Sequence, residues 1–164
     1  MSLPEIVRLR IGSGFDLHPL GSDPHRRFIL GGIEVASGNG PLGHSDADVI
    51  CHALADAILG SAGLGGIGDH FPSSDASLAG ADSMELLRRC LDIFTGAGYA
   101  LVNADATVVL QAPRLAVFRP AMEAGLGALL GVPVSVKAKS PENVGALGRQ
   151  EAVVCFANVL SVAP

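Results

Sequence analysis

The chain has 164 residues, of which 49% are hydrophobic, and it carries a formal net charge of −5 at pH 7. This length suits one compact domain over residues 1–164, with residues 1–7 as a loose leader. Because the chain is acidic and lacks a clustered basic face, we expect neither nucleic acid nor a membrane surface as its partner.

The three cysteines Cys51, Cys90 and Cys155 are odd in number, far apart and embedded in apolar runs. This usage indicates reduced structural thiols and therefore a cytoplasmic protein, rather than a disulfide framework or a cysteine zinc site. We expect no signal peptide and no membrane span, because no segment has the required basic start or the roughly 20 apolar residues in a row.

The first predicted element is a strand over residues 7–11, where apolar residues alternate with arginine. The glycines that follow, Gly12 and Gly14, let the backbone either turn or lie close to another segment. Asp16 and His18 are two residues apart, so in an extended chain they point the same way. Such a pair suits zinc or a similar divalent ion, although a surface turn is an equally ordinary setting for it.

An apolar run with helical spacing then predicts a helix from Ser45 to about Gly60. Ser45 and Asp48 resemble a capping box at its beginning. His52 lies within this helix, with Asp48 and Asp56 four residues away on either side, so either carboxylate could orient its ring. A lone helical histidine is more often a buried core residue than a ligand.

Taken together, Asp16, His18 and His52 form a candidate metal site. Three protein ligands leave one tetrahedral position open, which is typical of a catalytic or substrate-binding zinc ion and not of a closed structural one. We therefore expect a substrate to complete the coordination shell.

The rest of the chain continues to alternate strands, helices and glycine-rich loops, without repeats or low-complexity tracts. The predicted elements are a strand or hairpin over residues 28–35, a glycine-rich loop over 63–72, a core helix without chemistry over about 82–96, a strand within 99–110, a helix over 120–131, and strands over 134–139 and 152–162.

Two later loops carry cations at strand ends. In the turn over residues 111–115, Arg114 could bind phosphate, although solvated loop arginines are commoner. In the loop over residues 139–149, Lys139 and Arg149 flank a hydroxyl group and the carboxylate of Glu142. Such a loop has what a diphosphate with bound magnesium needs.

The glycine-rich loop over residues 63–72 could offer backbone amides to an anion, or it could be a flexible connector.

Several motifs in this order resemble the 2-C-methyl-D-erythritol 2,4-cyclodiphosphate synthase family of the non-mevalonate isoprenoid pathway, over nearly all the chain from Arg8 onward. The motifs are Gly-Phe-Asp-Leu-His at 14–18, Gly-His-Ser-Asp-Ala-Asp at 43–48 with His52, Gly-Ala-Asp-Ser at 80–83, Gln-Ala-Pro at 111–113, and Val-Lys-Ala at 136–138 followed by Glu142 and by Gly-Arg at 148–149.

The resemblance implies an α/β (α+β) single domain, with a mostly four-stranded mixed sheet covered by helices on one face, that assembles as a homotrimer with active sites between subunits. It implies zinc at Asp16, His18 and His52, and magnesium or manganese at Glu142. The implied enzyme is a phosphorus-oxygen lyase. It converts 4-diphosphocytidyl-2-C-methyl-D-erythritol 2-phosphate to the 2,4-cyclodiphosphate, with release of CMP.

The resemblance also implies residue roles. His44 and Ser140 would stabilise the transition state. The erythritol part would be held by Ser45, Phe71, Pro72, Ser73, Ser74 and Asp75, with the backbone amides of Gly66, Ile67 and Gly68. The cytidine diphosphate part would be held by Leu110, Gln111, Ala112, Pro113, Arg114, Leu115 and Ala116, with Lys139, Pro141 and Arg149.

Some positions depart from the family pattern, which has aspartates at Gly66 and Ser73, threonines at Lys139 and Ser140, often lysine at Arg114 and often phenylalanine at Ala146.

Two other functions are compatible with the residues. A zinc-dependent hydrolase would hydrolyse phosphoesters without a cyclic product. A trimeric protein that binds nucleotides or isoprenoids would show affinity without turnover.

Overall fold

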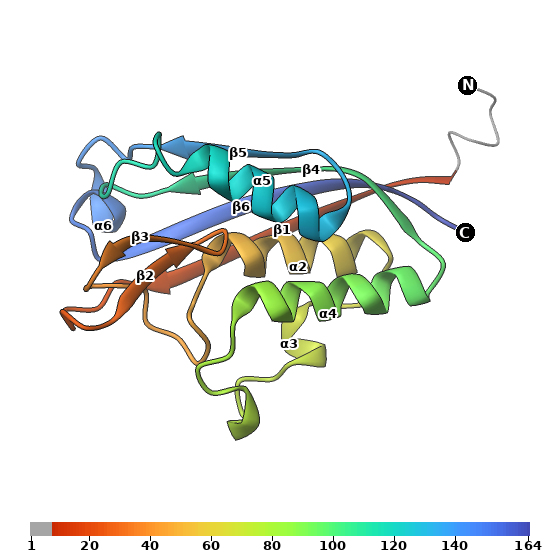
Figure 1. Ribbon diagram of the computed structural model, residues 1–164, viewed down its shortest axis with the longest axis horizontal. Coiled ribbons are helices and arrows are strands. Elements are labelled where there is room, and N and C mark those ends of the chain that lie inside the picture. The colour runs from red at the N-terminus through yellow and green to blue at the C-terminus, as the bar shows by residue number, and fades with distance from the viewer. Residues whose placement is uncertain (1–7) are drawn as a thin grey trace.

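The structure is a computed structural model that describes residues 8–164, so the leader predicted for residues 1–7 lies outside the described part. Its centre is a four-stranded sheet in the order β1-β6-β4-β5, in which β6 pairs antiparallel with β1 and β4, and β5 pairs parallel with β4 (Figure 1). The strands are β1 (Leu9–Pro19), β4 (Ala100–Val109), β5 (Val134–Lys139) and β6 (Ala152–Val162), and a separate hairpin contains β2 (Arg27–Leu30) and β3 (Ile33–Ser37).

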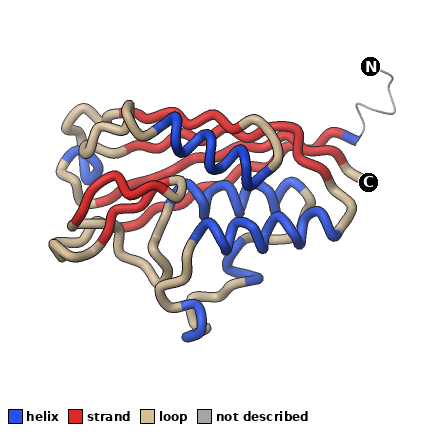
Figure 2. The backbone as a smooth tube through the Cα atoms, in the orientation of Figure 1, coloured by secondary structure: helices blue, strands red, loops and turns tan. Residues whose placement is uncertain are grey.

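Three longer helices lie on one side of this sheet, as Figure 2 shows. They are α2 (Val49–Ser61), α4 (Ser83–Gly96) and α5 (Arg119–Leu130), and the short elements are α3 (Ile67–His70), α6 (Gly145–Gly148) and the 3-10 helix η1 (Ala76–Leu78). Of the three longer helices, α2 and α5 pack on the sheet itself, and α4 packs on α2. The predicted fold class, a mixed sheet with helices on one face, is confirmed. Among the described residues, no helix is long and apolar enough to cross a membrane.

The glycines of β1 let α2 lie directly on the strand. A Cβ atom at Gly12 would lie 1.8 Å from the carbonyl oxygen of Ala57, and one at Gly14 would lie 1.8 Å from that of Ala53. The sequence left open whether these glycines serve a turn or a close approach to another segment, and the structure shows the close approach. The strand does not turn here but continues to Pro19.

Side chains of β1 alternate between the two faces of the sheet from Ile11 onward. Gly12, Gly14, Asp16 and His18 belong to the face under α2, whereas Phe15 and its neighbours on the other face are exposed. Phe15 pairs with Phe156 of β6, with ring centroids 5.0 Å apart. One strand thus contributes polar groups to the helix-covered side and apolar groups to a free surface.

The helix that carries His52 begins later than predicted. Asp48, not Ser45, is its N-cap, and its carboxylate accepts hydrogen bonds from the amides of Ile50 and Cys51. The chain turns just before this point, where Ala47 has a φ of 60°. Ser45 therefore lies in the preceding loop and is free of the capping role. The predicted hairpin, the other predicted helices and the predicted later strands are all confirmed.

Candidate metal centre and substrate pockets

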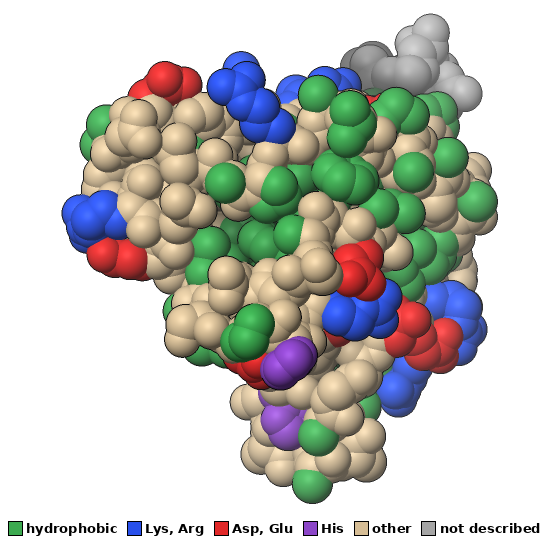
Figure 3. All heavy atoms as spheres, turned by 60° about the vertical axis from the view of Figure 1, so that its left-hand side comes forward, with side chains coloured by type: hydrophobic (Ala, Val, Ile, Leu, Met, Phe, Trp, Pro, Cys, Tyr) green, Lys and Arg blue, Asp and Glu red, His purple; other side chains and the backbone are tan. Residues whose placement is uncertain are grey.

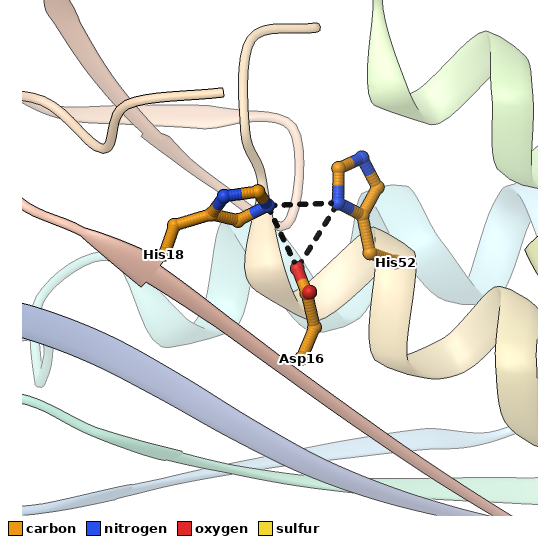
Figure 4. Close-up of side chains that lie close together, drawn as sticks. All are labelled: Asp16, His18 and His52. Carbon is orange, nitrogen blue, oxygen red and sulfur yellow. Dashed lines mark hydrogen bonds and ion pairs between the residues drawn. The ribbon is translucent and has the colours of Figure 1, made fainter. Parts of the chain in front are cut away.

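Asp16 and His18 from β1 meet His52 from α2, and Figure 4 shows the three side chains pointing toward one another. Asp16 Oδ2 lies 3.1 Å from His18 Nε2 and 3.0 Å from His52 Nδ1, and these two nitrogens are 3.3 Å apart. One carboxylate oxygen and two imidazole nitrogens form a donor set that suits zinc. No other such group of potential metal ligands occurs among the described residues.

The outer nitrogen of each ring is bonded to the protein. His18 Nδ1 lies 3.0 Å from the carbonyl oxygen of Leu42. Because a carbonyl only accepts, His18 carries a proton on Nδ1 and directs Nε2 into the cluster. His52 Nε2 lies 2.9 Å from the hydroxyl of Ser83 and 3.2 Å from that of Ser45. Such outer contacts orient rings that bind metals.

The electrostatics of the cluster also suit a cation. Burial alone would raise the pKa of Asp16, but its hydrogen bonds with His18 and His52 outweigh burial and lower the pKa to about 2. Burial lowers the pKa of His52, whereas the hydrogen bond and charge of Asp16 raise it more, so the pKa lies above its usual value. The carboxylate is thus ionised at neutral pH and attracts positive charge to this point.

Neither carboxylate suggested by helix spacing orients His52. Asp48 points away from the ring and bonds Gly32 N at 2.8 Å as well as the first amides of α2. Asp56 accepts from the amide of Ile67 at 2.7 Å. Ser83 holds the ring instead, so α4, which we predicted to lack chemistry, contributes a group to the site. Only the Gly-Ala-Asp-Ser motif at residues 80–83 signalled this from the sequence.

A hollow of about 220 Å³, the metal pocket, opens beside the cluster. In Figure 3 histidine side chains reach the surface next to hydrophobic and acidic ones on the lower part of the molecule. The metal pocket is lined by His18, His44, Ser45, His52, Ile67, Gly68, Phe71, Ser73, Leu78 and Leu86. Leu78 and Leu86 were not predicted, because only side-chain burial in the folded chain distinguishes them from other core leucines.

The loop after α2 forms the outer wall of the metal pocket. His44 Nε2 lies 3.0 Å from the carbonyl oxygen of Asp75, and the guanidinium of Arg89 lies 4.3 Å from the centre of the Phe71 ring. The other predicted residues of this loop do not line the pocket within the described structure. The amide of Gly66 is bonded to Asp69, and the carboxylate of Asp75 caps η1, while Pro72 and Ser74 are exposed.

A second hollow of about 460 Å³, the loop pocket, lies between the loops that follow β4 and β5. Asn143 N donates to Gln111 Oε1 at 3.0 Å, which joins the two loops. The loop pocket is lined by Leu110, Gln111, Pro113, Arg114, Leu115, Ala116, Arg119, Ala138, Lys139, Ser140, Glu142 and Asn143. Most residues of this wall were singled out in the sequence, but on two separate loops and not as one pocket.

Other residues of these loops lie differently. The peptide bond between Ala112 and Pro113 is cis. Arg149 pairs with Glu151 at 2.6 Å, and neither Arg149 nor Pro141 is in the described wall of the loop pocket. Arg119, which the sequence did not single out, is in that wall, and its buried Nε has no hydrogen-bond partner among the described residues.

Fold and site together define an α/β protein with a candidate metal site of three residues beside a surface pocket. A family model described as the YgbB family matches residues 9–162. The chain belongs to this family, because the match covers nearly all of it.

Similar proteins extend this match. The chain is 48% identical over 153 residues to 2-C-methyl-D-erythritol 2,4-cyclodiphosphate synthase of Symbiobacterium thermophilum, a comparison that covers 92% of this chain and 96% of that relative.

Two solved structures share the fold. The bifunctional IspDF from Campylobacter jejuni superposes with a TM-score of 0.90 at 36% identity, over 95% of this chain but only 42% of that longer one. IspF of Plasmodium falciparum, in a complex with CDP, superposes with a TM-score of 0.80 at 31% identity, over 94% of this chain and 96% of that one.

Proposed function

We propose that this protein is a cyclising phosphorus-oxygen lyase that converts 4-diphosphocytidyl-2-C-methyl-D-erythritol 2-phosphate to 2-C-methyl-D-erythritol 2,4-cyclodiphosphate and CMP, in isoprenoid precursor synthesis. The observation that carries the proposal is the cluster of Asp16, His18 and His52 at the metal pocket, in a chain of the YgbB family. Its relative from Symbiobacterium thermophilum is a synthase of this name.

The proposed reaction takes place within one substrate molecule. An oxygen of the 2-phosphate attacks the β-phosphorus of the diphosphate, and the bond from that phosphorus to the bridging oxygen breaks, so that CMP leaves with the bridging oxygen. No protein nucleophile and no water molecule is consumed. Catalysis therefore rests on positioning the two phosphates and neutralising their charge.

In the metal pocket, the chain's own groups fit the phosphorylated erythritol part. His44 projects into this hollow, and its bond to the carbonyl oxygen of Asp75 orients the ring. Ser45 contributes a hydroxyl, and the side chain of Phe71 forms an apolar wall. We assign His44 the task of stabilising charge on the reacting phosphate, because it is the histidine of this pocket that lies outside the metal cluster.

The loop pocket fits a cytidine diphosphate. Arg114 and Lys139 provide positive charge, and the hydroxyl of Ser140 lies in the same wall. Arg119 adds a cation whose buried Nε has no partner in the described structure, while its other end lies 3.8 Å from the carboxylate of Glu123. The CDP complex of the Plasmodium falciparum protein supports a nucleotide ligand for this fold.

Two metal ions belong to the proposal. Asp16, His18 and His52 would hold zinc, and Glu142, which lies in the wall of the loop pocket, would hold magnesium or manganese together with the diphosphate. When bound, these ions supply Lewis-acid neutralisation of phosphate charge. The protein's part is to hold the cluster open on one side and to keep the outer ring nitrogens bonded.

We also propose a homotrimer with its active sites between subunits. The metal pocket and the loop pocket of one described chain share no lining residue, and a substrate must contact both kinds of wall. On the free face of the sheet, Phe15 and Phe156 are 51% and 50% exposed, a degree that suits burial against a second subunit.

We also propose a cytoplasmic location, which the three buried free cysteines support.

One assay separates the proposed enzyme from the two alternatives. The purified protein is incubated with the diphosphocytidyl substrate, zinc and magnesium, and the products are identified. CMP and cyclodiphosphate in equal amounts support the synthase. Linear phosphate products would indicate a hydrolase, and tight binding without any product would indicate a binding protein.

A further inference from the structure

The hydroxyl of Ser83 occupies a defined place behind the metal cluster. It lies 2.9 Å from His52 Nε2, on the side of the ring away from Asp16, and Ser83 is only 1% exposed. Ser83 is the first residue of α4 and does not line the metal pocket, so it has no access to a substrate there. Its hydroxyl contacts groups behind the cluster, namely His52 Nε2, the carboxylate of Asp46 and, at 3.4 Å, the hydroxyl of Ser45.

The carboxylate of Asp46 fixes the direction of the Ser83 proton. The Ser83 hydroxyl donates to Asp46 Oδ1, and its backbone amide donates to Asp46 Oδ2 at 3.2 Å. A hydroxyl has one proton, and here that proton is used on a carboxylate, which can only accept. The remaining lone pairs of the hydroxyl therefore face His52, and His52 Nε2 must be the donor in that contact.

We infer that Asp46 and Ser83 are positioning residues that hold His52 with its proton on Nε2 and its Nδ1 lone pair directed at the metal, and so set the affinity of the site for a divalent ion. The inference rests on the metal site of the proposed function. A histidine that donates to an oxygen acceptor from its outer nitrogen has a fixed ring orientation and a fixed tautomer, and loss of such a partner weakens metal binding.

The contact also couples the beginning of α4 to α2 and to the loop just before α2, which lie 31 and 37 residues earlier in the chain at His52 and Asp46. His52 is on α2, Ser83 begins α4, and Asp46 lies in the loop between the hairpin and α2. Ser45 gives the ring a second hydroxyl at 3.2 Å. Removal of Ser83 alone therefore weakens the orientation of His52 without abolishing it.

The test measures zinc affinity of the full chain by competition with a chromophoric chelator. We expect Ser83→Ala and Asp46→Asn to bind zinc about 10-fold more weakly or worse, and Ser83→Thr, which keeps the hydroxyl, to restore affinity. Ser161→Ala is the control, because Ser161 is also buried but its hydroxyl donates to Ser61, away from the cluster. Cobalt(II) added to the metal-free variants gives a second readout, since its absorption bands change with ligand geometry.

If Ser83→Ala is too unstable to purify, Asp46→Asn decides the question. Zinc affinity and cobalt spectra of the Ser83 and Asp46 variants that match those of Ser161→Ala would overturn the positioning role while the metal site stands. Absence of zinc binding by the unaltered protein would overturn this inference together with the metal site of the proposed function.

Discussion

The two imidazole rings of the metal site each use one nitrogen toward the protein and one toward the cluster. His18 depends on the carbonyl of Leu42, and His52 depends on Ser83 and Ser45. The loop that carries Leu42 is itself held by Arg26, whose guanidinium donates to the carbonyl oxygens of Pro41 and Ser45. Residues outside the candidate ligand set therefore contact both rings and the loop beside them.

The opposite pKa shifts of Asp16 and His52 predict how pH acts on the metal-free protein. The stabilisation from Asp16 is complete above its usual pKa of 3.8 and is lost as the pH falls toward about 2. The stabilisation from His52 is complete below its usual pKa of 6.5 and is lost as the pH rises through the raised value. These two groups therefore favour the metal-free fold most strongly between pH 3.8 and 6.5.

Zinc should reverse the trend on the alkaline side, because the metal competes with the proton on His52. We expect the increase in melting temperature caused by zinc to grow as the pH rises above 6.5, measured against the same protein with chelator. His52→Ala, which lacks the competing proton and a ligand, should show little zinc effect at any pH. A zinc effect that shrinks with rising pH would contradict this assignment.

Among the elements, the packing of α2 on β1 matters most for the site, since these two contribute all three candidate ligands. Their separation is set by Gly12 and Gly14, where no side chain fits between the strand and the carbonyl groups of the helix. A larger residue there would move His52 away from Asp16 and His18. The packing at these two glycines therefore also sets the geometry of the candidate metal site.

We therefore predict that Gly14→Ala destabilises the protein by about 3 kcal/mol or more, at or above the upper end for overpacked sites, measured by urea unfolding. The variant should also lose zinc affinity. Gly125→Ala is the matched control, because Gly125 lies within α5 with no atom near an added Cβ, and it should gain about 0.4–1 kcal/mol. Equal stability of the two variants would show that α2 does not lie this close to β1.

Asp48 ties the beginning of α2 to the β2–β3 hairpin. Its fully buried carboxylate accepts from Gly32 N, from two amides of α2 and from Cys51 Sγ. Burial raises the pKa of Asp48, and the amide bonds oppose this rise in part. Asp48 therefore stabilises the fold, and its position one helical turn before His52 does not make its carboxylate a partner of that ring.

The consequence is a larger stability loss at Asp48 than at an ordinary cap. We expect Asp48→Ala to cost about 1 kcal/mol for the lost cap and about 1–3 kcal/mol more for buried donors left unpaired. Asp82→Ala, at the exposed cap of α4 with one bond to Met84 N, should cost only about 1 kcal/mol. Unfolding free energies for both variants, measured with chelator present, provide the comparison, and equal losses would refute the tie to the hairpin.

For the whole molecule, the exposed apolar residues on the free face of the sheet support the proposed trimer. Phe156→Glu should dissociate the trimer into monomers in analytical ultracentrifugation, because it places charge at the centre of that face. Ala128→Glu introduces the same charge on the exposed surface of α5 and should leave the assembly intact. An unaltered chain that sediments as a monomer would contradict the proposed assembly.

The sequence predicted the elements from local periodicity, and it singled out Asp16, His18 and His52, which the structure brings together. Asp16 and His18 share a face through the two-residue period of β1, and His52 lies within a strongly apolar helix. It could not predict the contact of Ser83 with His52, since that distance depends on how α4 packs against α2. The prediction also placed the N-cap at Ser45 instead of Asp48. Serine and aspartate both cap helices, and their spacing alone does not show which of the two begins the helix.

The most direct test of the proposed activity follows the source of oxygen in the products. The zinc-loaded protein is incubated with the diphosphocytidyl substrate and magnesium in water enriched in ¹⁸O, and the products are examined by ³¹P NMR and mass spectrometry. Ring closure within one molecule predicts CMP and cyclodiphosphate in equal amounts, both without ¹⁸O. Incorporation of ¹⁸O into a phosphate product, or no CMP at all, would contradict the account.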